Sequence, residues 1–277
     1  MKLKVSFIQF LNAVPLGWGL TEGAYRDIVD LVFDVPSGCA QHLAAGEVDV
    51  GLIPVIEYQN IEGLKVLPGI SIGAAREVKS VLFISKVPIE EVSRVAVDRS
   101  SRTSVALLKI ILQEFYRKDS VEYTAEPPNP ERMLELYDAA LLIGNPALHI
   151  PSSLLVYDLA HEWNRFTGLP FVFAFWAVRA GVDLQEQAER FYLSREEGLK
   201  AIDTVALRYS KRLGLPPSEI RDYLNNLDYF LDDASQRGLE TFFQLAAQTT
   251  LIPSPKPLNL YDFKQPAVTP RLARISR

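Results

Sequence analysis

Apolar and polar positions follow a pattern that occurs twice in the first half of the chain. In its first occurrence, strand-like segments rich in apolar residues cover residues 5–10, 30–35 and 48–54. In its second, they cover residues 94–98, 121–124 and 139–144. Segments with helical spacing separate them in both sets. Strands that alternate with helices predict parallel sheets with right-handed crossovers, so we expect two α/β lobes.

Two more segments connect the predicted lobes. Residues 79–86 alternate like a strand that leads toward the second lobe, and the wholly apolar residues 171–178 mark the return. We place the first lobe at residues 1–88 plus 177–277 and the second at residues 89–176.

The sequence after the return is mainly helical. Ser194 and Glu197 have the spacing of a capping box, which predicts a helix from there to about residue 213. A second helix is expected to begin near Asp233. Prolines then predict an extended segment at 253–257, and residues 271–277 indicate a frayed basic tail.

Composition argues against several classes of function. The chain has 277 residues, 48% of them hydrophobic, and a net charge of −5, so a polyanion such as nucleic acid is a poor candidate partner. The single Cys39 allows no internal disulfide, and the three histidines lack metal-binding spacing, so we expect no metal. No apolar run is long enough for a membrane helix and no signal peptide is evident, which predicts a cytoplasmic protein without a membrane partner.

Candidate chemistry lies where strands end. In open parallel sheets, ligands bind beyond the carboxyl ends of the strands, at helix N-termini. Asn12 occupies such a turn in the first lobe, and Ser100, Ser101, Arg102, Thr103 and Ser104 occupy one in the second. Each turn alone is also explained by helix capping. Their occurrence in both facing lobes favours a small anionic ligand in the cleft.

Other chemistry has less support. The sequence has no GxGxxG, GxxxxGK[ST], GxSxG or HExxH motif, so nucleotide, serine-hydrolase and zincin readings lose their basis, and no cofactor is expected. Glu57 could act as a base, but an acid at a helix start, favoured by the helix dipole, is the commoner case. We interpret the histidines as surface or capping residues. The aromatic residues from Trp163 to Trp176 line a pocket or pack the core.

Five segments occur together in order: FLNAVPL at residues 10–16, VGLIPV at 50–55, VKSVLFIS at 78–85, DRSSRTS at 98–104 and TGLPFVFA at 167–174. In this combination the chain resembles the chorismate dehydratase family of the futalosine route to menaquinone, over roughly residues 1–263. The resemblance implies a type II periplasmic-binding-protein fold, with two lobes, a cleft between them and a helical C-terminal region.

The resemblance also implies the reaction. Chorismate would lose water to give 3-[(1-carboxyvinyl)oxy]benzoate, with Asn12 and Ser80 as catalytic residues. The substrate-binding residues would be Ser100, Ser101, Arg102, Thr103, Ser104, Gly144, Asn145 and Phe171. None of these is a general base at neutral pH, so we expect the enolpyruvyl carboxylate of the substrate to take the ring proton. The chain departs from the family pattern at Asn145-Pro146, where an Asp and a small residue are usual.

Two alternatives stay open at this point. One is a cytoplasmic protein of the same fold that binds or senses a small carboxylate, since fold does not fix function. The other is a sister enzyme for another cyclic carboxylate. For the chorismate enzyme itself, the expected assembly is a monomer or a weak homodimer.

Overall fold

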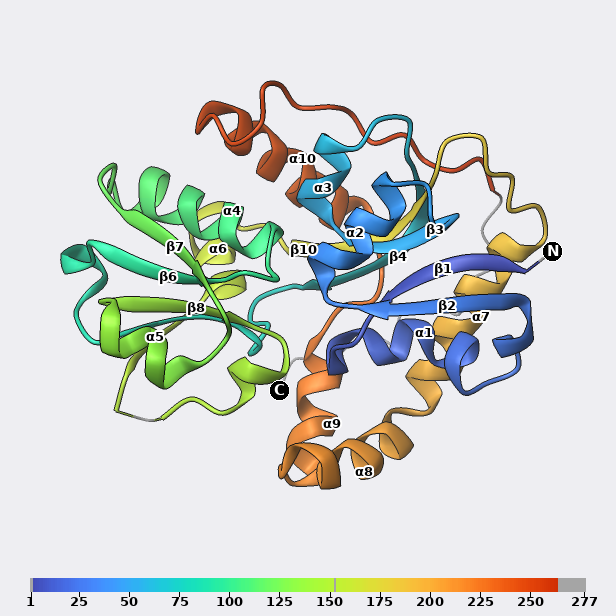
Figure 1. The fold of residues 1–277 in the computed structure, drawn as a ribbon, viewed down its shortest axis with the longest axis horizontal. Coiled ribbons are helices and arrows are strands. Elements are labelled where there is room, and N and C mark those ends of the chain that lie inside the picture. The colour runs from blue at the N-terminus through green and yellow to red at the C-terminus, as the bar shows by residue number, and fades with distance from the viewer. Residues whose placement is uncertain (1, 152, 264–277) are drawn as a thin grey trace.

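The computed structural model describes residues 2–151 and 153–263, which form two α/β lobes lying side by side (Figure 1). Each lobe is built on one five-stranded sheet. The basic segment predicted at 271–277 lies outside the described residues. Within them, no helix combines the length and the apolar character that crossing a membrane requires.

The two sheets share one plan. The first has the order β2-β1-β3-β10-β4, with strands β1 (Leu3–Ile8), β2 (Val29–Asp34), β3 (Val50–Pro54), β4 (Lys65–Ala74) and β10 (Phe171–Val178). The second has the order β7-β6-β8-β5-β9, with strands β5 (Val81–Ser85), β6 (Arg94–Asp98), β7 (Glu122–Glu126), β8 (Ala139–Ile143) and β9 (Leu155–Asp158). The predicted repeat is therefore present.

Both sheets are mixed, whereas the sequence pattern predicted parallel ones. Three strands of each sheet are mutually parallel, as expected from the helical crossovers. β10 runs antiparallel to β3 and β4, and β5 runs antiparallel to β8 and β9. Each of these two strands follows a crossing from the other lobe, so no helical crossover within its own sheet forces it to be parallel.

Strand pairing divides the chain at other points than the predicted boundaries at 88 and 176. Residues 81–85 belong to the second sheet, because β5 pairs with β8 and β9. Residues 171–176 belong to the first sheet, because β10 pairs with β3 and β4. The chain therefore crosses between β4 and β5 and returns between α6 (Leu159–Thr167) and β10.

The helices of the two repeats lie close to the predicted positions. They are η1 (Leu11–Ala13), α1 (Val14–Thr21), η2 (Arg26–Ile28), α2 (Pro36–Ala44), α3 (Val55–Asn60), η3 (Ile89–Glu91), α4 (Thr103–Ile110), a π-helical turn η4 (Ile111–Phe115), α5 (Pro130–Leu136) and η5 (Asn145–Leu148). The C-terminal region contributes α7 (Gln187–Lys200), α8 (Ile202–Leu213), α9 (Pro217–Asn226) and α10 (Asp233–Gln248). Figure 1 shows α7 beside α1 and the first sheet, with α8 and α9 below them.

The predicted helix start at Ser194 is wrong. Ser194 lies in the middle of α7, where its Oγ donates to the Leu16 carbonyl at 2.8 Å and accepts from the Leu20 N–H at 3.2 Å. Gly198 lets the two helices approach, since a Cβ there would overlap the Pro15 carbonyl. The serine therefore joins α7 to α1 and does not cap a helix. Close packing of these helices fixes the element that directly follows η1.

Candidate functional site

A cleft lies between the two lobes, at the carboxyl ends of the parallel strands. The empty space within it is about 470 Å³, part of it open to solvent. The first lobe lines it with Ile8, Phe10, Asn12, Pro36, Pro54, Ile72, Phe173 and Ala174. The second lobe lines it with Val81, Ser101, Arg102, Thr103, Ser104, Ile143 and Gly144. The sequence placed candidate chemistry at this edge of both sheets.

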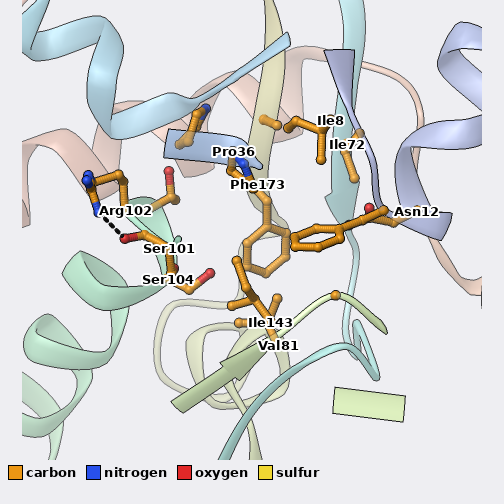
Figure 2. A pocket seen from close by; sticks show the side chains of 15 residues that line it. Ile8, Asn12, Pro36, Ile72, Val81, Ser101, Arg102, Ser104, Ile143 and Phe173 are labelled. Atoms are coloured by element: carbon orange, nitrogen blue, oxygen red, sulfur yellow. Dashed lines mark hydrogen bonds between the residues drawn. The ribbon is translucent and has the colours of Figure 1, made fainter. Parts of the chain in front are cut away.

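The centre of the cleft is apolar and its two ends are polar. Figure 2 shows Phe173 in the middle, with Ile143 and Val81 beside it. Ser101, Arg102 and Ser104 lie on one side of that ring, and Asn12 lies on the other. A flat ring with polar substituents at both ends matches such an arrangement.

The serines of the turn before α4 and of its first residues differ in what their side chains contact. The buried carboxylate of Asp98 accepts two hydrogen bonds through Oδ1, from the Ser100 hydroxyl at 2.7 Å and the Ser100 N–H at 2.9 Å. The Ser100 hydroxyl is thereby directed toward Asp98. Ser101 and Ser104 line the cleft instead, and each is nearly buried. Burial raises the pKa of Asp98, opposed by these bonds from Ser100.

Two polar atoms at the cleft are buried without a hydrogen-bond partner among the described residues. They are Oδ1 of Asn12, in η1 of the first lobe, and Oγ of Ser101, in the second lobe. Buried polar groups are almost always paired in folded proteins, because leaving one unpaired is costly. A ligand with hydrogen-bonding groups at both ends would remove this cost on both lobes.

Arg102 carries the only positive charge among the described residues that line the cleft. Its Nη1 donates to the backbone carbonyls of Arg99 and Ser101, each at 3.0 Å, and its Nε lies 3.7 Å from Oε1 of Glu57. The guanidinium therefore sits at the rim, held by the turn. Glu57, in the first turn of α3, is occupied by this ion pair across the lobes.

Further contacts join the lobes around the cleft. The N–H of Ser37 donates to the carbonyl of Ser100 at 3.2 Å, and the N–H of Ile56 donates to Oγ1 of Thr103 at 3.3 Å. The N–H of Leu11 donates to Oδ1 of Asn145 at 3.2 Å. The lobes are thus held together in a closed arrangement.

Four of the predicted site residues lie outside the residues that line the cleft. Ser80 is fully buried, and its Oγ accepts a hydrogen bond from the Tyr223 hydroxyl at 2.8 Å. Phe171 packs in the core, with its ring centroid 5.3 Å from that of Trp163. Ser100 and Asn145 make the contacts described above. The family resemblance implied a role in the site for all four, but in the structure each side chain contacts a neighbouring residue.

Groups for acid–base or metal chemistry are scarce at the cleft. The described lining residues include no Asp, Glu, His or Cys, and no cluster of three or more such residues suited to a metal occurs in the described ranges. Burial, reinforced by the charge of Asp34, raises the pKa of the nearby Cys39 thiol to about 12, which keeps it protonated at neutral pH. His42 contacts Asp34 and Glu47 near the surface.

Sequence reasoning missed most of the apolar lining, such as Ile8, Pro54 and Ile72. A signal was present, because each lies at or near the carboxyl end of a strand of the first sheet. Residue type alone does not distinguish apolar residues that line a cleft from apolar residues of the core. The end of the strand would have been the better criterion.

Known proteins resemble this chain in sequence and in fold. A protein family described as "Menaquinone biosynthesis" matches residues 3–248. A chorismate dehydratase from Thermus thermophilus is 30% identical, over 84% of this chain and 91% of the relative.

Two solved structures share the architecture. Protein AF1704 from Archaeoglobus fulgidus has a TM-score of 0.73 at 19% identity, covering 91% of this chain and 98% of that one. The periplasmic aliphatic sulphonate binding protein SsuA from Escherichia coli has a TM-score of 0.68 at 15% identity, covering 100% and 97%. These likenesses confirm the predicted two-lobed, periplasmic-binding-protein-like fold. The match over residues 3–248 shows more than fold, and the chain belongs to the menaquinone biosynthesis family.

Proposed function

We propose that this protein is a chorismate dehydratase, which removes water from chorismate to give 3-[(1-carboxyvinyl)oxy]benzoate. The relative from Thermus thermophilus carries that name and matches most of the chain. The observation that carries the proposal is the form of the cleft. An apolar centre is flanked by Asn12 Oδ1 and Ser101 Oγ, two buried polar atoms that have no partner in the described part of the chain.

Chorismate fits this form by its chemistry. It is a dianion with a six-membered ring, a ring carboxylate, a hydroxyl and an enolpyruvyl ether. The ring would lie against Phe173, and one carboxylate would accept hydrogen bonds from the hydroxyls of Ser101 and Ser104 at the start of α4. Arg102 adds a positive charge at the same end.

The reaction is an elimination across two neighbouring ring carbons. The carbon that bears the enol ether loses its proton, and the C–H electron pair becomes the last double bond of the aromatic ring. The next carbon loses its hydroxyl, which takes up the proton released from the first carbon and leaves as water. Asn12 can donate through its amide N–H₂ to the departing oxygen and accept through Oδ1, so it can steady the hydroxyl as the bond breaks.

The proton acceptor in this proposal is the enolpyruvyl carboxylate of chorismate itself. The described residues that line the cleft include no carboxylate, imidazole or thiol to take the proton. An intramolecular base needs only to be held in the right geometry, and closed lobes that exclude water serve that purpose.

Glu57 provides the test of substrate assistance, because it is the acidic side chain paired with Arg102 at the rim. We expect Glu57→Gln to keep turnover within about threefold at saturating chorismate, as for the loss of a partly exposed ion pair. Initial rates over a range of chorismate concentrations measure this. A folded Glu57→Gln protein that loses nearly all turnover would show that a protein side chain, and not the substrate, accepts the proton.

The function itself is tested with purified protein, chorismate and no added metal or nucleotide. We expect the mass of the product to be lower by one water, with the absorbance of an aromatic ring, and Asn12→Ala to slow its formation by about a hundredfold or more. Chorismate that binds unchanged would favour a binding or sensing protein. Neither turnover nor binding would favour a sister enzyme with another cyclic carboxylate.

Location and assembly belong to the same proposal. We place the protein in the cytoplasm, acting as a monomer or a weak homodimer. Cell fractionation and light scattering of the purified chain measure the two properties separately.

A further inference from the structure

The amide of Asn145 reaches from the second lobe to the turn of the first lobe that carries Asn12. Asn145 begins η5 just after β8, and its Oδ1 accepts a hydrogen bond from the N–H of Leu11 at 3.2 Å. Leu11 is the first residue of η1 and directly precedes Asn12. The contact therefore joins two segments that are 134 positions apart in the chain.

The Leu11 N–H needs a partner from outside its own turn. The first N–H groups of a helical turn have no carbonyl behind them to accept a bond. The residue at the N-cap is Phe10, and it makes no side-chain capping bond. Leu11 is fully buried, so water does not replace the missing acceptor. Asn145 supplies it from the opposite lobe.

Gly144 makes this approach possible. Its φ is +64°, a left-handed conformation that favours glycine, and a Cβ there would lie 2.6 Å from the ring of Phe10. Its N–H donates to the carbonyl of Ser80 at 2.8 Å, which ties η5 to the start of β5. A larger residue at position 144 would collide with Phe10, the residue directly before Leu11.

We propose that Asn145 is a positioning residue, which holds η1 so that the Asn12 side chain faces the reacting hydroxyl only when the lobes are closed. This inference rests on the proposed function, in which Asn12 contacts that hydroxyl. Since the acceptor belongs to the second lobe, opening of the cleft releases the turn. Asn145 therefore makes correct placement of Asn12 conditional on closure. A neutral acceptor suits this place, because an Asp would bring negative charge toward a dianion.

Three variants separate this role from a merely structural one. Asn145→Leu keeps the size but removes the acceptor, and we expect kcat to fall by about tenfold to a hundredfold, as for a displaced reacting group. Asn145→Asp keeps the acceptor, so kcat is retained while KM for chorismate rises. Asn145→Ala serves in place of Asn145→Leu if the latter fails to fold. Circular dichroism checks the fold of each variant.

A double-mutant cycle with Asn12→Ala is the decisive kinetic measurement. We expect Asn12→Ala alone to lower kcat by about a hundredfold or more. If Asn145 acts through Asn12, adding Asn145→Leu to Asn12→Ala lowers kcat by less than about threefold further. Losses that simply multiply, or a kcat that Asn145→Leu leaves unchanged, would overturn the inference.

Hydrogen exchange tests the contact without relying on turnover. Mass spectrometry of a peptide spanning residues 8–13 should show faster exchange at Leu11 in Asn145→Leu and wild-type exchange in Asn145→Asp. Unchanged exchange in Asn145→Leu would overturn the inference. If wild-type protein does not convert chorismate, the proposed function fails, and exchange still decides whether Asn145 holds the turn.

Discussion

Ser100 and Ser101 are neighbours in sequence, but only Ser101 faces the cleft. Oδ1 of Asp98 accepts both the hydroxyl and the N–H of Ser100, which fixes the turn and directs that hydroxyl inward. Oγ of Ser101 is buried and has no partner in the described part of the chain. At the residue scale, the cleft thus depends on a carboxylate that does not line it.

This difference predicts opposite behaviour for the two serines. Ser101→Ala should leave the free energy of unfolding unchanged or slightly higher, since it removes an unpaired buried hydroxyl, while KM for chorismate rises about tenfold or more. Ser100→Ala, the matched control, should lower the free energy of unfolding by about 1–3 kcal/mol, because it breaks a buried bond to a carboxylate. Urea unfolding and initial rates measure both effects. An unchanged KM in Ser101→Ala would contradict a ligand contact there.

Asp98 should also make stability depend on pH. Burial raises its pKa, so the folded state holds the proton more tightly than the unfolded state does. Its contribution to stability is therefore fully present below the unfolded pKa of about 3.9 and is lost as the pH rises through the folded pKa. Relative to Asp98→Asn, the free energy of unfolding of the wild type should therefore be higher at pH 4, near the unfolded pKa, than at pH 7.

Urea unfolding of both proteins at the two pH values gives this comparison. Asp158, whose pKa burial also raises, is present in both proteins, so its effect cancels in the difference. Equal differences at pH 4 and pH 7, or a larger one at pH 7, would show that Asp98 does not titrate in this direction.

At the element scale, local patterns predicted starts of helices only where the partner was also local. The helix predicted to begin near Asp233 is α10, and the side chain of Asp232 caps it by accepting from the N–H of Ser235. Ser194 has an equally good pattern, yet its partner Leu20 lies 174 positions away. The sequence pattern also did not predict β4, which contains Pro68 and Gly69, two residues typical of turns. β4 lies at the edge of its sheet, where such residues are tolerated.

The contact between α1 and α7 predicts the effect of Gly198→Ala. In a helix this change is normally favourable by about 1 kcal/mol. Here the new Cβ would overlap the Pro15 carbonyl, so α1 must move and the net change in the free energy of unfolding should be a loss of about 1–3 kcal/mol. Gly168→Ala is the control, because nothing lies within 4 Å of its Cβ and only the φ of +71° is unfavourable. Thermal unfolding should therefore show the larger loss for Gly198→Ala.

For the whole molecule, the repeat of strands and helices was sufficient to predict two lobes and the edge of the sheets at which the cleft lies. It did not predict that β5 and β10 each complete a sheet after crossing from the other lobe. It also did not predict the bonds that join the lobes, such as that from Ser37 to Ser100. These features depend on pairing between distant segments, which the local order of apolar residues does not encode.

The bonds between the lobes predict how the closed form responds to Thr103→Val. The N–H of Ile56 donates to Oγ1 of Thr103 at 3.3 Å, and both residues are buried. Valine keeps the shape but leaves this N–H unpaired in the closed form, whereas water reaches it when the lobes separate. The closed form should lose about 1–3 kcal/mol relative to the open one, which raises KM for chorismate about fivefold or more.

Small-angle scattering should show a larger radius of gyration for the Thr103→Val protein than for wild type, both without ligand. Thr103→Ser retains the hydroxyl and should behave like wild type in both measurements. If the valine and serine variants match, the Ile56–Thr103 bond does not hold the lobes together, and the remaining contacts carry closure.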